Sequence, residues 1–371
     1  MELFKSVLEN KKIEGTHFTG LTDDAFAKLL HEMKEFKDRG ILVVTTSLFE
    51  ANKLYELVSD YTDKVLLFPM DDFLTSEAVA ISPDLMITRL ETLNQILGDS
   101  KSIVITNLMG YLRFLPTKEV YKNSFISLRV VEDIDPTKLV ENLVDIGYTR
   151  ETIVTRTGEF AVRGFVVDIF PLGSEYPIRI EFFGDTIDSI RTFDPDTQKS
   201  ISTLKSIEVK PFSEFIVEDS SVSLEVRKQK YLPEYSKNVS SLYQYMDNAY
   251  LCFKDYRQMK ISYQNVLEEV LEYRTEKDKK FVGEYFLPLE EVEDAFHYLT
   301  VDNYTGYSPV TFHSFDIKSV PIFRENIEAI QKYLKENLKL GKTILIFLKD
   351  YQIKNFKKHF FSFLNELKIL F

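Results

Sequence analysis

Hydrophobic and polar positions in the first hundred residues follow two alternating patterns. Continuous apolar runs at 41–45, 65–68 and 102–106 are typical of strands that are buried on both faces of a sheet. Between them, apolar residues recur at spacings of three and four along 26–36 and 86–97, which predicts amphipathic helices. Strands that alternate with helices predict a parallel α/β sheet, an architecture that often hosts nucleotide sites.

Local signals predict where two of these helices begin. Ser47 and Glu50 have the S-x-x-E spacing of a capping box, in which each side chain binds the other residue's backbone N–H. Ser82 precedes Pro83 and Asp84, which suits an N-cap, a proline at the first helical position and an acid near the positive end of the helix dipole.

The pattern changes after Pro116. A helix over 137–146 is predicted to end at Gly147, and strand signals then dominate up to about Pro211. The segments 178–183 and 187–193 flank a glycine-containing turn and are interpreted as a hairpin. We therefore predict a compact, mostly antiparallel insert.

These changes of pattern along the chain divide it into four predicted segments. Residues 1–115 and 211–305 are predicted to form one α/β domain, which 116–210 interrupt as an inserted domain. Residues 306–371 are predicted to form a small α/β domain, with a helix that ends at Gly341 and a strand at 343–347. Its apolar tail has no stop signal, so we expect a truncated chain.

Composition narrows the class of protein. The 371 residues include 46 Lys and Arg and 58 Asp and Glu, for a net charge of −12, so the chain is a poor non-specific DNA binder. Its single cysteine, Cys252, excludes an intrachain disulfide and a multi-cysteine zinc site. The sequence has no signal peptide and no apolar run of about 18 residues, which predicts a soluble, cytoplasmic protein without a membrane partner.

One segment has the G-x-x-x-x-G spacing of a phosphate-binding loop ahead of a helix. The defining lysine is absent: a leucine takes its position, and in a register shifted by two residues a pair of aspartates would repel a triphosphate. We therefore interpret the segment as a plain loop before a helix, where no nucleotide is expected to bind or be hydrolysed. This vestigial phosphate loop comprises Gly15, Gly20, Leu21, Thr22, Asp23 and Asp24.

Other candidate sites have simpler interpretations. The five histidines show no ligand spacing, so no metal site is predicted. Cys252 lies in an apolar context and is interpreted as a small core residue. The Asp71-Asp72 pair is interpreted as a solvated loop, and the basic run Lys277–Lys280 as a solvated helix end.

The predicted hairpin is more informative. Strand alternation puts the apolar side chains of 178–183 on one face and Arg179, Glu181 and Phe183 on the other. Arginine and aromatic residues are enriched at protein-binding hot spots, and Arg163 would join them if its strand pairs nearby. The alternative is a surface ion pair between Arg179 and Glu181 beside a partly buried Phe183; both interpretations stay open at this point.

Three ordered motifs carry a resemblance to a known family: R-G-F-V-V-D-I-F-P at 163–171, R-I-E-F-F at 179–183 and I-D-S-I-R at 187–191. Together they resemble the second domain shared by the excision-repair protein UvrB and the bacterial transcription-repair coupling factor. The resemblance covers about residues 1–300 and is strongest over 147–195.

The amino-terminal part is more similar to the coupling factor. The Walker lysine of UvrB is missing, and M-D-D-F-L-T-S-E-A at 70–78 stands where an aromatic hairpin of UvrB would lie. The resemblance implies a degenerate RecA-like parallel α/β domain, an inserted UvrB-like antiparallel α+β domain and a small C-terminal α/β domain.

The resemblance also implies a function. The fragment would recruit UvrA through Arg163, Arg179 and Phe183, in transcription-coupled nucleotide excision repair, without a cofactor or catalysis of its own. The full-length protein would use ATP and Mg²⁺ to translocate on double-stranded DNA and displace stalled RNA polymerase. Its C-terminal domain would mask the UvrA-binding face.

Two alternatives remain at this point. One is a UvrB-type, DNA-damage-binding ATPase subunit, against which the missing lysine argues. The other is a structural scaffold module without affinity for UvrA.

Overall fold

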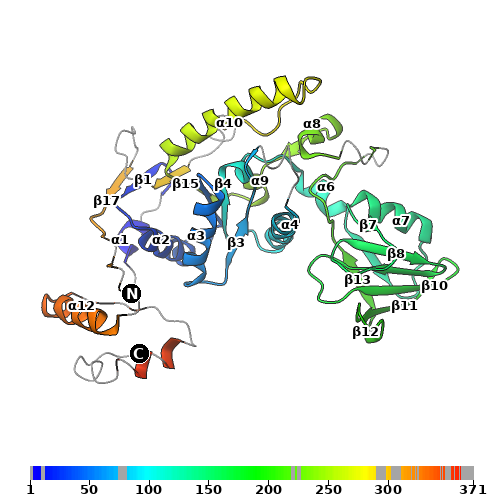
Figure 1. Ribbon diagram of the computed structural model, residues 1–371, viewed down its shortest axis with the longest axis horizontal. Coiled ribbons are helices and arrows are strands. Elements are labelled where there is room, and N and C mark those ends of the chain that lie inside the picture. The colour runs from blue at the N-terminus through cyan, green and yellow to red at the C-terminus, as the bar shows by residue number, and fades with distance from the viewer. Residues whose placement is uncertain are drawn as a thin grey trace.

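Two sheets organise the chain, and they form separate lobes in Figure 1. The computed structural model describes residues 3–9, 13–73, 82–218, 222–223, 227–289, 298–301 and 311–318, together with most of 320–360.

The larger sheet has seven strands in the order β17-β1-β16-β15-β2-β4-β3, and every neighbouring pair is parallel. Its strands are β1 (Thr16–Thr19), β2 (Ile41–Thr45), β3 (Val65–Phe68), β4 (Ile103–Asn107), β15 (Tyr250–Lys254), β16 (Tyr298–Val301) and β17 (Thr311–Ser314). The predicted parallel α/β sheet is therefore confirmed, and all residues of β2 and β4 are buried, as their continuous apolar runs require.

Helices cover both faces of this sheet, because alternate residues of each strand point to opposite sides. Ile41 and Val43 of β2 belong to a core with helices α2 and α3, whereas Leu42 and Val44 belong to a second core with α4. The helices of this lobe are α1 (Lys5–Leu8), α2 (Asp23–Phe36), α3 (Leu48–Ser59), α4 (Pro83–Gly98), α5 (Leu108–Tyr111), α9 (Leu242–Tyr245) and the long α10 (Tyr256–Glu276) (Figure 1).

Only part of the predicted capping is present. The Ser47 hydroxyl accepts a hydrogen bond from the Glu50 N–H, as expected. The Glu50 carboxylate accepts one from Lys254 at 2.5 Å, so this is half of a capping box. Ser82 occupies the N-cap of α4 but makes no side-chain capping bond.

The smaller sheet has six strands in the order β12-β11-β10-β9-β8-β7, and all its pairs are antiparallel except β7 with β8. Its strands are β7 (Thr149–Arg150), β8 (Glu159–Arg163), β9 (Val166–Ile169), β10 (Ile178–Phe183), β11 (Thr186–Phe193) and β12 (Ser200–Leu204). Leu139 and Leu143 of helix α7 (Pro136–Asp145) share a core with Phe160 and Ile180, so α7 packs on one face. The predicted mostly antiparallel pairing in this segment and its 178–193 hairpin are confirmed.

Short paired strands lie where the chain enters and leaves this lobe. Strand β6 (Ile126–Arg129) pairs with β13 (Ser206–Val209), and β5 (Leu115–Pro116) pairs with β14 (Val239–Ser240), both antiparallel. The remaining short helices are α6 (Lys118–Asn123), η3 (Gln229–Tyr231) and α8 (Leu232–Tyr235).

The interpretation of the vestigial phosphate loop as a plain loop is wrong. Residues 16–19 form the buried strand β1, which pairs with both β16 and β17. Only the three residues from Gly20 to Thr22 connect this strand to α2. Gly20 adopts φ +74°, and an added Cβ would lie 1.8 Å from the Phe315 carbonyl oxygen, so the connection is packed against neighbouring backbone.

The C-terminal part is described only in pieces. Helix α12 (Ile327–Lys339) ends near Gly341, whose φ is +74°, as predicted. Strand β17 belongs to the large sheet although it lies beyond residue 305, where the sequence suggested a boundary. The predicted strand at 343–347 lies largely outside the described residues. None of the described helices is both long and apolar enough to cross a membrane.

Candidate functional site

The face of the smaller sheet opposite α7 carries the polar side chains of the hairpin motif. Cross-strand pairing aligns Arg163, Val166 and Glu181 in one row, and Asp168, Arg179 and Arg191 in the next. Residues directly opposite each other on paired strands project to the same side. We call the surface formed by Arg163, Asp168, Arg179, Glu181, Phe183, Ser189 and Arg191 the polar face.

Arg179 is held rigidly on this face. Its Nε and Nη2 donate to the two carboxylate oxygens of Asp168 at 2.7 and 2.8 Å, and Nη2 also donates to Gln198 at 2.9 Å. The guanidinium carbon lies 4.4 Å from the centre of the Phe193 ring. Such a bidentate, stacked arrangement fixes both the position and the plane of the guanidinium.

The charge of Arg179 is therefore already compensated. The hydrogen bond from Arg179 to Asp168 raises the pKa of the guanidinium, against the opposing effect of its partial burial. Asp168 is almost fully buried, so it needs this partner. Nη1 of Arg179 makes no hydrogen bond within the described part of the chain, and it remains available to another molecule.

The alternative ion pair between Arg179 and Glu181 does not form. Glu181 accepts instead from Arg191 and, at 2.9 Å, from the Ser189 hydroxyl. Both partners lie on the neighbouring strand β11. Glu181 pairs across strands because cross-strand neighbours are closer to each other than residues i and i+2 of one strand. The polar face is thus organised by pairs between strands.

Arg163 lies on the same face and is exposed. The Arg163 guanidinium donates one hydrogen bond, from Nη2 to the Thr152 carbonyl oxygen at 3.1 Å. It forms no ion pair among the residues that the structure describes. Its charge is therefore the more accessible of the two predicted arginines.

Phe183 is 84% exposed, which contradicts the alternative of a partly buried ring. It ends β10 immediately before Gly184, whose φ of +63° supports the tight turn to β11. The structure thus brings Arg163, Arg179 and Phe183 onto one face of one sheet. Sequence reasoning missed Phe165, which is 69% exposed in the neighbouring turn; the glycine before it was the available signal.

The vestigial phosphate loop leads into α2, whose first turn carries Asp23 and Asp24. The Asp23 carboxylate lies at the N-terminus of α2 and pairs with Lys53 at 2.6 Å and with Lys254 at 2.9 Å. Partial burial opposes the shift, but hydrogen bonds from both lysines lower the Asp23 pKa. A carboxylate thus occupies the helix end where a phosphate would bind.

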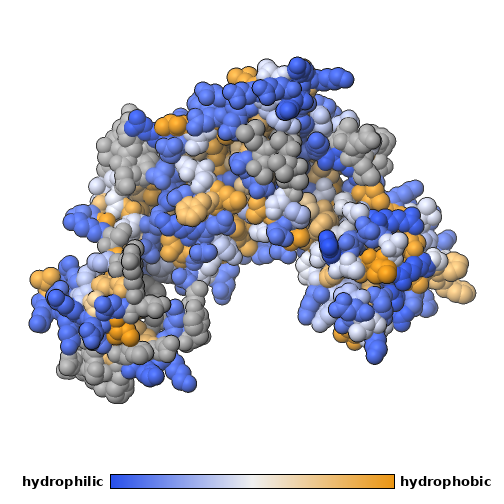
Figure 2. Space-filling model, viewed as in Figure 1, coloured by the Kyte–Doolittle hydropathy of each residue, from blue (hydrophilic) through white to orange (hydrophobic). Residues whose placement is uncertain are grey.

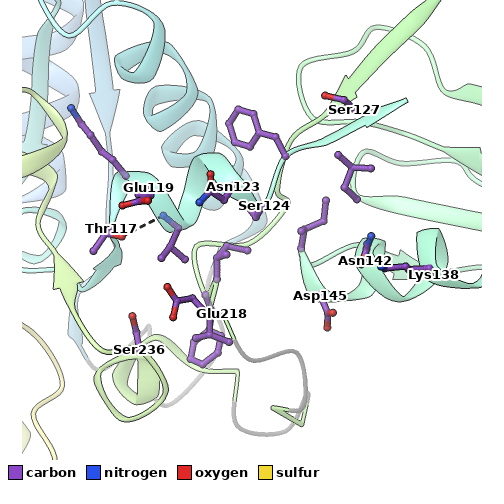
Figure 3. A pocket seen from close by; sticks show the side chains of 18 of the residues that line it. Thr117, Glu119, Asn123, Ser124, Ser127, Lys138, Asn142, Asp145, Glu218 and Ser236 are labelled. Atoms are coloured by element: carbon purple, nitrogen blue, oxygen red, sulfur yellow. Dashed lines mark hydrogen bonds between the residues drawn. The ribbon is translucent and has the colours of Figure 1, made fainter. Parts of the chain in front are cut away.

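A cleft of about 1150 Å³ separates α6 from α7 (Figure 3). Glu119, Asn123 and Ser124 line one side, and Asn142 and Asp145 of α7 line the other. Charges of both signs line it, and the Asp145 carboxylate is already paired with Arg227 at 2.8 Å. The cleft therefore indicates no particular ligand.

The remaining candidates lie in the core or at the surface. Cys252 is buried, and desolvation strongly raises the pKa of its thiol, so it is a core residue. No group of three or more potential metal ligands exists within the described ranges, which include Asp71 and Asp72. Lys277, Lys279 and Lys280 are exposed just beyond α10.

Comparisons with known proteins agree with this architecture. Residues 126–215, which contain the polar face, match the UvrB interaction domain family.

The wider chain is similar to transcription-repair-coupling factors. It is 36% identical to that of Bacillus subtilis over 218 residues, which make up 58% of this chain and 18% of the relative. It is also 36% identical to that of Staphylococcus aureus (strain MRSA252) over 210 residues, and 37% identical to that of Staphylococcus haemolyticus over 207 residues. These matches cover 56% and 55% of this chain and again 18% of each relative. The predicted resemblance to a module of the coupling factor is thus confirmed.

Proposed function

We propose that this chain is a UvrA-recruiting adaptor module in transcription-coupled nucleotide excision repair, and that its polar face contacts UvrA. One observation carries the proposal: an exposed arginine, a braced arginine and an exposed phenylalanine share one face of the UvrB interaction domain. Arginine and aromatic side chains dominate the energetics of protein interfaces. The names of the similar proteins support a role in coupling transcription to repair.

The three residues have different roles in this proposal. Arg163 offers an uncompensated charge, which would pair with an acidic group of UvrA. Arg179 offers the two N–H groups of Nη1 in a fixed plane, because Asp168 and Gln198 hold the rest of its guanidinium. Phe183 would enter an apolar recess, where burial of its exposed ring supplies hydrophobic stabilisation.

We also propose a role for a longer protein that contains this module. There, a motor supplied with ATP and Mg²⁺ would translocate on double-stranded DNA and displace stalled RNA polymerase. Another domain would mask the polar face until repair is required. The part matched here is 18% of the length of the relatives.

Calorimetric titration of UvrA against this chain tests the adaptor proposal. We expect saturable binding that is weakened by Arg163→Ala and by Phe183→Ala, each by about 1–4 kcal/mol. Arg150→Ala is the matched control, because Arg150 is exposed on the edge strand β7 and pairs with Phe160, at the other end of β8 from Arg163. We expect this control to bind like the wild type.

Two results would contradict the proposal. The absence of UvrA binding by the wild-type chain would favour a structural scaffold. ATP turnover by the wild-type chain would favour a UvrB-type ATPase, and it can be measured on the same preparation.

A further inference from the structure

Three large apolar side chains lie exposed at one end of the smaller sheet. The exposed fractions are 84% for Phe183, 80% for Val131 and 69% for Phe165. Figure 2 shows apolar spheres that protrude at the end of this lobe, where Figure 1 labels β10. Isolated exposed hydrophobic residues are ordinary, but a group of them on adjoining segments is typical of an interaction surface.

Backbone hydrogen bonds place the three residues on neighbouring segments. The Phe182 N–H donates to the Phe165 carbonyl at 2.9 Å, which joins the β8–β9 turn to the end of β10. Phe183 pairs with Thr186 across the hairpin turn. On the other side of β11, the Val131 N–H donates to the Ile187 carbonyl at 2.8 Å. We call Phe165, Phe183 and Val131 the apolar row.

Val131 is held in an unfavourable conformation. Its φ is +70°, in the left-handed region that β-branched residues rarely adopt. The ladder of hydrogen bonds to Ile187 imposes this geometry, because the Ile187 N–H also donates to the Glu132 carbonyl at 2.9 Å. A glycine would suit the backbone better, and an exposed valine adds little to the core. The valine side chain is therefore best explained by contact with another molecule.

Charged side chains lie on both sides of the row, and exposed Arg129 and Lys205 are near Val131. Arg163 lies toward the Phe165 side, since it pairs with Val166, next to Phe165. Asp185 and Asp188 are exposed on the hairpin, and neither forms an ion pair within the part of the chain that the structure describes. A complementary surface presents an acidic group near Arg163 and basic groups near the two aspartates.

We propose that the apolar row is a second contact for UvrA, continuous with the polar face, and that Asp185 and Asp188 receive basic groups of UvrA. The inference rests on the proposed function. It adds Val131, Phe165 and the two aspartates to the binding surface.

The experiment is a titration of UvrA against Phe165→Ala and Val131→Gly variants of the whole chain. Each variant is expected to bind at least about tenfold more weakly than the wild type. Val131→Gly should keep or raise the melting temperature, because glycine suits the positive φ, so its lost affinity cannot be attributed to unfolding. Phe49→Ala is the matched control: Phe49 is 74% exposed on α3 of the other lobe.

A charge reversal tests the contribution of the two aspartates. The double variant Asp185→Lys with Asp188→Lys should bind at least about tenfold more weakly, most clearly at low salt where exposed charges act over longer distances. Wild-type affinity in Phe165→Ala, Val131→Gly and the charge variant, with a loss in Arg163→Ala, would overturn the apolar row and leave the adaptor function intact. No binding by the wild type would overturn both.

Discussion

Arg89 and Glu214 form a bidentate ion pair in which both hydrogen bonds are 2.9 Å long and both side chains are almost completely enclosed. Arg89 belongs to α4 of the larger lobe, whereas Glu214 follows β13, where the chain returns from the smaller lobe. Arg113 adds a third bond to Glu214 at 2.7 Å. The two arginines therefore fix the returning chain to the larger lobe.

Removal of Arg89 should destabilise the folded protein, because the enclosed Glu214 carboxylate then loses a partner. We expect Arg89→Met to lower the free energy of unfolding by about 3–5 kcal/mol, because Glu214 loses its bidentate partner at a site enclosed by protein. Urea denaturation measures the change. Lys101→Ala is the control, since the pair of Lys101 with Asp38 lies at the surface and should contribute little. Equal stabilities of the two variants would contradict a structural role for Arg89.

Titration of the Glu214 carboxylate should make the free energy of unfolding depend on pH in the acid range. Burial alone would raise the Glu214 pKa, but the charges of Arg113 and Arg89 outweigh burial and lower the pKa to about 2. Because the folded pKa lies below the ordinary value of 4.5, the stabilisation is complete above about pH 5 and is lost as the pH falls toward 2. It amounts to about 3 kcal/mol.

Urea denaturation between pH 6 and pH 3 (roughly the window in which the carboxyl titrates) should therefore show a steeper loss for the wild type than for Glu214→Gln. Other carboxylates titrate in both proteins, so the difference between them isolates Glu214. Parallel pH profiles would show that the pKa of this carboxyl is the same in the folded and unfolded protein, which would contradict the prediction.

Substitution of Gly20 tests whether the short connection between β1 and α2 is tightly packed. We expect Gly20→Ala to destabilise the fold by more than about 1 kcal/mol, because alanine disfavours the φ of +74° and its Cβ would overlap the Phe315 carbonyl. Gly98→Ala is the control, since nothing lies within 4 Å of a Cβ at the end of α4. There, thermal denaturation should show an unchanged or higher melting temperature. A tolerated Gly20→Ala would contradict the packed connection.

We expect Arg179 to stabilise the fold in addition to its proposed contact with UvrA. We expect Arg179→Ala to lower the free energy of unfolding by about 2 kcal/mol, between the values for surface and buried pairs, because Asp168 is left buried. A double-mutant cycle with Asp168→Asn measures their coupling by urea denaturation. Additive effects would show that the two side chains act independently. Arg163→Ala, which breaks no ion pair, is the cleaner test of binding.

Much of the fold follows from local pattern. The apolar runs of β2 and β3 were sufficient to predict buried parallel strands, and alternation along 178–183 predicted which side chains would be exposed. These features depend on residues close together in the chain. Strand β1, in contrast, depends on distant residues, because its partners β16 and β17 lie almost three hundred residues away in the chain. The glycines on either side of it favoured a loop in the sequence analysis.

The candidate site shows the same division. Phe183 was predicted because it lies in a distinctive motif, but the partner of Arg179 was not. Asp168 contacts Arg179 only because β9 pairs with β10 in one register, and no local pattern fixes a register between strands. Val131 escaped notice for a similar reason, since its exposure depends on the segment that crosses beside β11.

The pairing of strands β6 and β13 determines how the smaller lobe is joined to the rest of the chain. Their antiparallel ladder, from Ile126 to Arg129 opposite Val209 to Ser206, brings the two ends of the smaller lobe side by side. A segment whose ends meet can be excised or transplanted with little disturbance to its host, because a short bridge closes the gap. The lobe is thus joined to the rest of the chain at a single place, so its transfer to another protein would require few changes in either.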